Sequence, residues 1–152
     1  MGFIVDLRKC AELAARNEWV TNDGDPDSKE CVAAVKALIA IGNKLYSTSS
    51  WRRGKKVMGN NIMPGTAIAT FRKDGSTGKY YFKGHAAIFV DYRGGGFVVY
   101  DQWKPSELNP GGRRFSKRII PLDCADSPSN NADAFYVIEL IEEAPNGLSQ
   151  CK

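Results

Sequence analysis

The chain changes from helical to β patterning at about residue 65, and this switch limits the folds it can adopt. Before it, apolar residues recur at helical spacing over residues 3–17, and again from a cap at Asp27 or Ser28 to about Ile41. After it come short β patterns separated by turn signals, at residues 66–72, 79–82, 85–91, 97–103, 118–122 and 134–141. This order predicts an α+β fold, with N-terminal helices packed on a largely antiparallel sheet of about five to six strands.

The length and composition indicate one domain that spans residues 1–152. The 152 residues, 43% of them hydrophobic, suffice for one buried core. No apolar run approaches the roughly 20 residues of a membrane helix, and the N-terminus lacks the features of a secretory signal. We therefore expect a soluble protein without a membrane span, made in the cytoplasm without a signal peptide. The stretch from Gly42 to Pro64 is expected to be a long loop beside the functional site.

The charge and the metal-ligating residues narrow the possible functions. The formal charge is +4, and basic residues gather in two groups that favour an anionic partner: Arg52, Arg53, Lys55 and Lys56, then Arg113, Arg114, Lys117 and Arg118. Because aromatic stacking positions and a binding motif are missing near them, we expect no nucleic-acid partner. One histidine and four cysteines without a C-x-x-C pair do not suit a structural zinc site, so no metal is expected.

Cys31 is the first candidate for catalysis. A thiol is a useful nucleophile only as a thiolate, which a helix N-terminus or a nearby imidazole stabilises. The sequence before Cys31 places its sulfur in the first turn of the second predicted helix, near unpaired backbone N–H groups. The alternative interpretation is a small core residue.

His85 is the only histidine and precedes the apolar run from Ala86 to Val90. Its small neighbours leave room for the end of the Cys31 helix to approach the ring. A third group must orient the imidazole. A hairpin loop of three or five residues centred on Arg93 places Asp101 opposite His85, and a four-residue loop places Gln102 there. We favour Asp101, because a carboxylate fixes the tautomer and also stabilises the imidazolium.

Four short motifs, in this order, resemble papain-like bacterial cell-wall amidases, the superfamily of NlpC-type and CHAP-type peptidoglycan hydrolases. The motifs are Glu30-Cys31-Val32-Ala33, Pro64-Gly65-Thr66-Ala67-Ile68-Ala69, Gly84-His85-Ala86-Ala87-Ile88-Phe89 and Val99-Tyr100-Asp101-Gln102-Trp103. The resemblance covers about residues 28–142. It implies a papain-like fold, no cofactor, Cys31 as nucleophile, His85 as base and Asp101 as orienting group. Val32 departs from the serine that many NlpC-type enzymes have.

Within that superfamily the small chain resembles the amidase effectors of type VI secretion systems. This resemblance implies secretion by that apparatus, action in the periplasm of a target Gram-negative cell, and a cognate immunity protein that plugs the cleft. It implies peptide stems or cross-links of diaminopimelate-type peptidoglycan as the substrate. We favour the D-alanyl–diaminopimelate cross-link over the γ-D-glutamyl–diaminopimelate bond.

Two tryptophans and the remaining cysteines are further candidates for roles in the site or in stability. Trp51 and Trp103 are candidate walls of the substrate cleft, with core packing as the alternative. A disulfide between Cys10 and Cys151 would suit an oxidising compartment, with a Cys124–Cys151 bridge or reduced thiols as alternatives. The competing functions are a non-catalytic basic binding or inhibitor module, and a deamidase or transglutaminase-like cysteine enzyme that acts on proteins.

Overall fold

A computed structural model describes residues 2–21, 29–39, 47–122 and 127–140, and it confirms the α+β class. Its helices are α1 (Leu7–Ala15) and α2 (Cys31–Ile39), with short 3₁₀ turns η1 (Thr48–Ser50), η2 (Pro128–Asn130) and η3 (Ala132–Ala134). Its strands are β1 (Trp51–Lys56), β2 (Ala67–Lys73), β3 (Tyr80–Arg93), β4 (Gly96–Trp103), β5 (Arg113–Ile120) and β6 (Phe135–Leu140). No helix among the described residues is long and apolar enough to cross a membrane.

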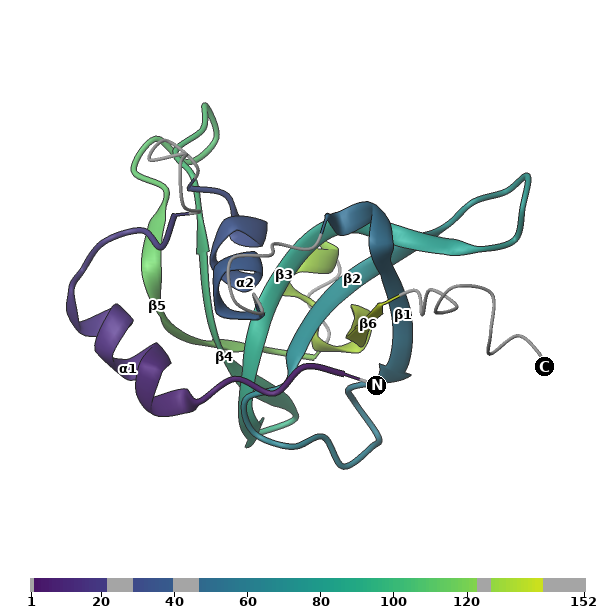
Figure 1. The fold of residues 1–152 in the computed structure, drawn as a ribbon, viewed down its shortest axis with the longest axis horizontal. Helices are drawn as coiled ribbons and strands as arrows, with labels where there is room; N and C mark the ends of the chain where they lie inside the picture. Colours follow the sequence, from purple (N-terminus) through teal and green to yellow (C-terminus); the bar gives the residue numbers. More distant parts are fainter. Residues whose placement is uncertain (1, 22–28, 40–46, 123–126, 141–152) are drawn as a thin grey trace, which may run out of the picture.

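The strands form one antiparallel sheet in the order β1-β6-β2-β3-β4-β5. Both helices pack on the same face, α1 against β5 and α2 against β3 and β4. Figure 1 shows that β3 and β4 leave their common turn together and then diverge, with α2 lying between them. The strand pairing agrees, because it ends at Ile88 and Tyr100 and leaves the far ends of both strands unpaired with each other. This opening admits the start of α2 to the sheet.

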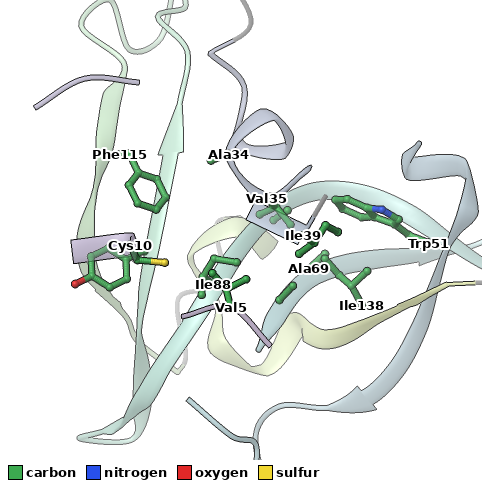
Figure 2. Close-up of a cluster of buried hydrophobic side chains, with 13 residues drawn as sticks. Val5, Cys10, Ala34, Val35, Ile39, Trp51, Ala69, Ile88, Phe115 and Ile138 are labelled. Atoms are coloured by element: carbon green, nitrogen blue, oxygen red, sulfur yellow. The ribbon is translucent and has the colours of Figure 1, made fainter. Parts of the chain in front are cut away.

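Each face of the sheet covers its own cluster of buried side chains. The cluster under the helices joins Ala34, Val35 and Ile39 of α2 to sheet residues such as Trp51 and Ile88, and Figure 2 shows these side chains meeting. The opposite face buries a second cluster, which includes Phe89, Phe97 and Phe135. Residues that alternate along β3 and β4 therefore point to different clusters, as the two-residue period of a strand requires.

Helix α1 is shorter than the sequence pattern predicts, and α2 begins later than predicted. The carboxylate of Asp6 accepts a hydrogen bond from the backbone N–H of Arg8 and caps α1. The residues before it pair with the sheet instead, because Val5 donates to the carbonyl of Gly65 and Ala67 donates to that of Phe3. Helix α2 begins at Cys31. The predicted cap residues Asp27 and Ser28 and the predicted end near Ile41 lie outside the described residues.

The predicted loop from Gly42 to Pro64 is wrong in part, because it contains β1. This strand has the polar sequence Trp-Arg-Arg-Gly-Lys-Lys and lacks the alternation that reveals a strand. Tertiary contacts hold it at the sheet edge beside β6. The guanidinium of Arg53 lies over the rings of Tyr80, at 3.4 Å, and Tyr136, at 4.6 Å. Lys56 pairs with Asp133 at 2.7 Å.

Candidate active site

A cleft of about 650 Å³ lies where α2 meets the open ends of β3 and β4. Its lining includes Cys31, Lys36, His85, Trp103, Arg118 and Asn130. These side chains come from α2, β3, β4, β5 and η2, so elements far apart in sequence build it. Among the described residues, no group of three or more histidine, cysteine or acidic side chains is placed to hold a metal ion.

Cys31 is the first residue of α2 and is half-buried at the cleft. Its sulfur lies 3.9 Å from the carbonyl oxygen of Gly84, the residue before His85. At this position the sulfur lies near the positive end of the helix dipole, which favours negative charge. Cys31 and His85 line the same cleft, and Cys31 is near enough to His85 to be one of the causes that raise the pKa of its imidazole. The structure therefore brings the two predicted residues together.

His85 reaches the cleft through a bulge in β3. The pairing with β2 slips between Phe82 and Ala86, so the two predicted strands at residues 79–82 and 85–91 are one bulged strand. Gly84 has a φ of +112°, and a Cβ there would lie 2.5 Å from the hydroxyl oxygen of Thr70. That hydroxyl donates to the carbonyl of Lys83 and accepts the backbone N–H of His85. Thr70 thus holds the bulge in one conformation and fixes the backbone of His85.

The β3–β4 hairpin places Asp101 on the same face as His85, by a route different from the predicted one. The predicted loop of three to five residues is wrong, because Arg93 pairs with Gly96 and only two glycines form the turn. Their φ angles of 55° and 86° suit the type I′ turn that joins tight hairpins. A two-residue turn alone would place Gln102 on the His85 face. The ladder slips by one residue between Phe89 and Asp91, and this bulge brings Asp101 to that face instead.

Asp101 is 1% exposed and accepts hydrogen bonds from three cationic or potentially cationic side chains. Nε2 of His85 lies 2.7 Å from its Oδ2, Nε of Arg118 lies 2.8 Å from the same oxygen, and Nε of Arg113 lies 3.3 Å from Oδ1. Burial raises the pKa of Asp101, but the hydrogen bond and charge of His85 and the charge of Arg118 outweigh it, so the pKa falls below its usual 3.8. The carboxylate stays ionised.

The state of His85 follows from this partner. An ionised carboxylate only accepts hydrogen bonds, so Nε2 of His85 carries a hydrogen and Nδ1 is the nitrogen left for Cys31. Burial lowers the pKa of His85, but the interactions with Asp101 and Cys31 raise it to about 9, above its usual 6.5. Near neutral pH this favours the imidazolium, which is the partner that a thiolate needs. The three side chains together form a candidate nucleophile, proton carrier and orienting group.

Comparison with known proteins identifies the family. Residues 3–138 match the family of domesticated amidase effector 2, Dae2. The chain belongs to the Dae2 family. A Salmonella typhi protein named type VI secretion amidase effector 2 protein is 36% identical over 120 residues, which cover 72% of this chain and 84% of the relative. The solved structure of type 6 secretion amidase effector 2, Tae2, matches with a TM-score of 0.56 and 32% identity, covering 87% of this chain and 94% of the other.

These findings confirm the predicted resemblance to type VI secretion amidase effectors. They also agree with the α+β fold, because the Tae2 structure superposes on most of this chain. The match to the Dae2 family covers every residue of the candidate site described above.

Gln102, the alternative third member, faces away from His85 in this Dae2 chain. Its side chain is fully buried, and its Oε1 accepts the backbone N–H of Val20 at 2.8 Å. Its Nε2 donates to the carbonyls of Val20, at 2.8 Å, and Glu30, at 3.0 Å. Glu30 immediately precedes Cys31. Gln102 therefore fastens the start of α2 to β4 and fixes the position of Cys31 from behind.

Replacing Gln102 with alanine is expected to lower the free energy of unfolding by about 2 to 4 kcal/mol, because a fully buried side chain is lost and three part-buried backbone groups lose their partner. Urea unfolding followed by circular dichroism measures this change. A substitution on the neighbouring strand, Ser116→Ala, removes a half-buried hydroxyl that donates to the carbonyl of Arg114 and should change the free energy by less than about 1 kcal/mol. A loss of less than about 1 kcal/mol in Gln102→Ala would contradict the fastening role.

The two predicted cleft tryptophans have different locations. Trp103 lines the cleft, with its ring centroid 6.2 Å from that of His85. Trp51 is fully buried in the core cluster under the helices and cannot form a wall of the cleft, so that prediction is wrong. Its indole packs edge-on against Phe82 at 5.1 Å, and Phe82 does line the cleft. Burial of this large ring within the helix-covered core explains the difference.

Of the three cysteines besides Cys31, only Cys10 lies in the described residues. Cys10 lies in the core cluster with no exposed surface, and burial raises the pKa of its thiol to about 11. It is a free thiol among the described residues. Cys124 and Cys151 lie outside the described residues, so the Cys10–Cys151 bridge and its Cys124–Cys151 alternative stay predictions.

Two arginines that the sequence assigned to a basic surface group serve the candidate site instead. Arg113 and Arg118 bind Asp101 from β5, and Arg118 also donates to the side-chain oxygen of Asn130, at 2.9 Å. The charge of these two residues is therefore paired within the site. They are five residues apart, so an unbroken strand would turn them to opposite faces, and the register slip between Asp101 and Trp103 in the β4–β5 pairing brings both to Asp101. The sequence pattern gives no signal of this arrangement.

The pKa of His85 predicts how stability depends on pH. Folded His85 keeps its proton to about pH 9, whereas the unfolded group loses it near 6.5. The folded state therefore binds more protons in this interval, so its stability is fully present below about pH 6.5 and falls as the pH rises to about 9. Asp101, whose pKa is lowered, contributes stability above pH 3.8 that is lost as the pH falls further.

Urea unfolding of the native protein and of His85→Gln across pH 6 to 9 tests this expectation. The native free energy of unfolding should decline across the interval. The variant should show a flatter profile, whatever its absolute stability. Parallel profiles for the two proteins would show that another group causes the decline.

Proposed function

We propose that this chain is a cysteine amidase that hydrolyses a peptide bond in diaminopimelate-type peptidoglycan. Cys31 is the nucleophile, His85 the general acid and base, and Asp101 the group that orients and charges the imidazole. The observation that carries the proposal is the buried His85–Asp101 pair, at 2.7 Å, beside a cysteine at a helix N-terminus in a cleft. A buried ion pair gains little stability by itself, so a chemical role is its better explanation.

The reaction is an acyl transfer in two halves. The Cys31 thiolate attacks the amide carbonyl, and the backbone N–H of Cys31 stabilises the oxyanion that forms. The His85 imidazolium gives its proton to the departing amine as the carbon–nitrogen bond breaks, which leaves a thioester. Neutral His85 then takes a proton from water, which attacks the thioester. The carbon–sulfur bond then breaks. The products are a carboxylic acid and the restored thiolate and imidazolium pair.

The names of the relatives support the biological setting. Both are called type VI secretion amidase effectors. We infer that this chain is likewise delivered by a type VI secretion apparatus, cleaves the cell wall in the periplasm of a target Gram-negative cell, and is blocked in the producing cell by a cognate immunity protein. Among the candidate bonds we propose the D-alanyl–diaminopimelate cross-link.

Digestion of purified sacculi tests the proposal. Diaminopimelate-type sacculi are incubated with the native protein, and the soluble muropeptides are analysed by mass spectrometry, with the Cys31→Ala variant as the blank. Conversion of cross-linked dimers to monomers that keep their stem length is expected. Stems shortened after D-glutamate would move the proposal to the γ-D-glutamyl–diaminopimelate bond. Sacculi left intact, in a parallel assay that shows glutamine deamidation in a protein substrate, would replace it with the deamidase function.

A further inference from the structure

The charged side chains that line the cleft include more cations than anions. Besides His85, whose imidazolium pairs with Asp101, the charged residues of the lining are Glu30, Lys36, Lys104 and Arg118. Glu30 pairs with Lys104 at 3.0 Å, and Arg118 pairs with the buried Asp101 at 2.8 Å. Lys36 has no acidic partner among the residues that the structure describes. It is the one cation of this described lining that is left for a ligand.

Helix geometry directs Lys36 to the cleft. Val32 and Lys36 are four residues apart on α2, so they lie on one helix face, and both line the cleft with Cys31. The opposite face of the helix holds Ala33, Ala34 and Val35, which are at most 1% exposed against the sheet. Lys36 therefore lies about 7.5 Å along the helix axis from Cys31. This distance corresponds to about two residues of extended peptide.

The surroundings favour an anion beside Lys36. The residue is half-buried, and an ammonium group on the wall of a cleft gains from an ionic partner that also accepts its hydrogen bonds. The other cation of this wall, Lys104, is 59% exposed and already paired, so it contributes less selectivity. The pocket thus suits a peptide with a carboxylate near the scissile amide.

We propose that Lys36 binds a free carboxylate of the substrate, about two residues from the scissile bond, and so makes the cleft selective for acidic peptides. This inference rests on the proposed amidase function. Peptidoglycan stems carry free carboxylates on several residues, and some cell walls replace one of them with a carboxamide. The proposal therefore also predicts which walls are poor substrates, because a carboxamide removes the charge that Lys36 binds.

Binding measurements separate this inference from the catalytic proposal. Two synthetic stem peptides, identical except for a carboxylate or a carboxamide at the chosen position, are titrated by calorimetry into the Cys31→Ala variant, which cannot turn them over. We expect the carboxylate peptide to bind about 10- to 100-fold more tightly, the range of a charge-assisted hydrogen bond. Adding Lys36→Met should reduce this ratio to within about twofold of one, and Lys36→Arg should largely keep it.

The matched control is Lys79→Met, an exposed lysine outside the cleft lining, which should leave the ratio unchanged. A ratio that survives Lys36→Met overturns the inference, and so does a native ratio near one or equal weakening of both peptides. Failure of the native protein to cleave the carboxylate peptide would count against the amidase function alone, since the affinities remain measurable.

Discussion

Replacing Cys31 with alanine is expected to lower the rate of muropeptide release by about 10⁴-fold or more, because no other group replaces the lost nucleophile. The protein should keep its fold. Cys31 is half-buried at the cleft, and besides its interaction with His85 its sulfur makes a long contact with the carbonyl of Gly84, at 3.9 Å. The free energy of unfolding should therefore change by less than about 1 kcal/mol.

Cys10→Ala is the matched control, because it removes the same atom from a different environment. Cys10 is fully buried in the core cluster under the helices, so the variant should lose about 1 to 2 kcal/mol of stability and keep the native rate. Muropeptide release followed by chromatography, beside urea unfolding of both variants, measures the two effects. Release by Cys31→Ala above about one hundredth of the native rate would exclude Cys31 as the nucleophile.

Asp101→Asn is expected to lower kcat by about 10³- to 10⁴-fold, the size of the effect that the same change has in a serine protease triad. The amide keeps the shape of the side chain but loses the negative charge that stabilises the imidazolium. It also permits the wrong ring tautomer, since an amide can donate as well as accept. We expect the pKa of His85 to fall in this variant, because the hydrogen bond with Asp101 is the first of the causes that raise it.

The same variant leaves Arg113 and Arg118 without their buried acid, so it should also unfold more easily, by about 3 kcal/mol. Asp91→Asn is the control, because Asp91 is an exposed acid on the same hairpin whose carboxylate accepts only the backbone N–H of Tyr92 among the described contacts. It should leave both rate and stability unchanged. A folded Asp101→Asn that keeps more than a tenth of the native kcat would rule out Asp101 as the orienting group.

The predicted strands 66–72, 97–103 and 134–141 correspond to β2, β4 and β6 within a few residues, because their apolar side chains alternate or run together in the buried part of the sheet. Strand β1 was missed, since its stability comes from Arg53 stacking on tyrosines of other strands. The sequence pattern predicts a break between two strands at Gly84, where the structure has a bulge. The group that stabilises this bulge is the hydroxyl of Thr70, which lies on another strand, β2. Local patterns contain no information on such partners.

The sequence by itself determined the α+β class, a helix with Cys31 in its first turn and the strand that carries His85, because helix and strand periods and turn residues are local properties. The tertiary structure decided the rest of the site. A single bulge in the hairpin placed Asp101, rather than Gln102, on the same face as His85, since a shift of one residue turns every side chain of a strand to the other face. The tertiary structure also placed Gln102 in a hydrogen bond with the start of α2. It placed Arg113 and Arg118 beside the buried carboxylate of Asp101. These contacts join residues that are far apart in the sequence, so local sequence patterns do not predict them.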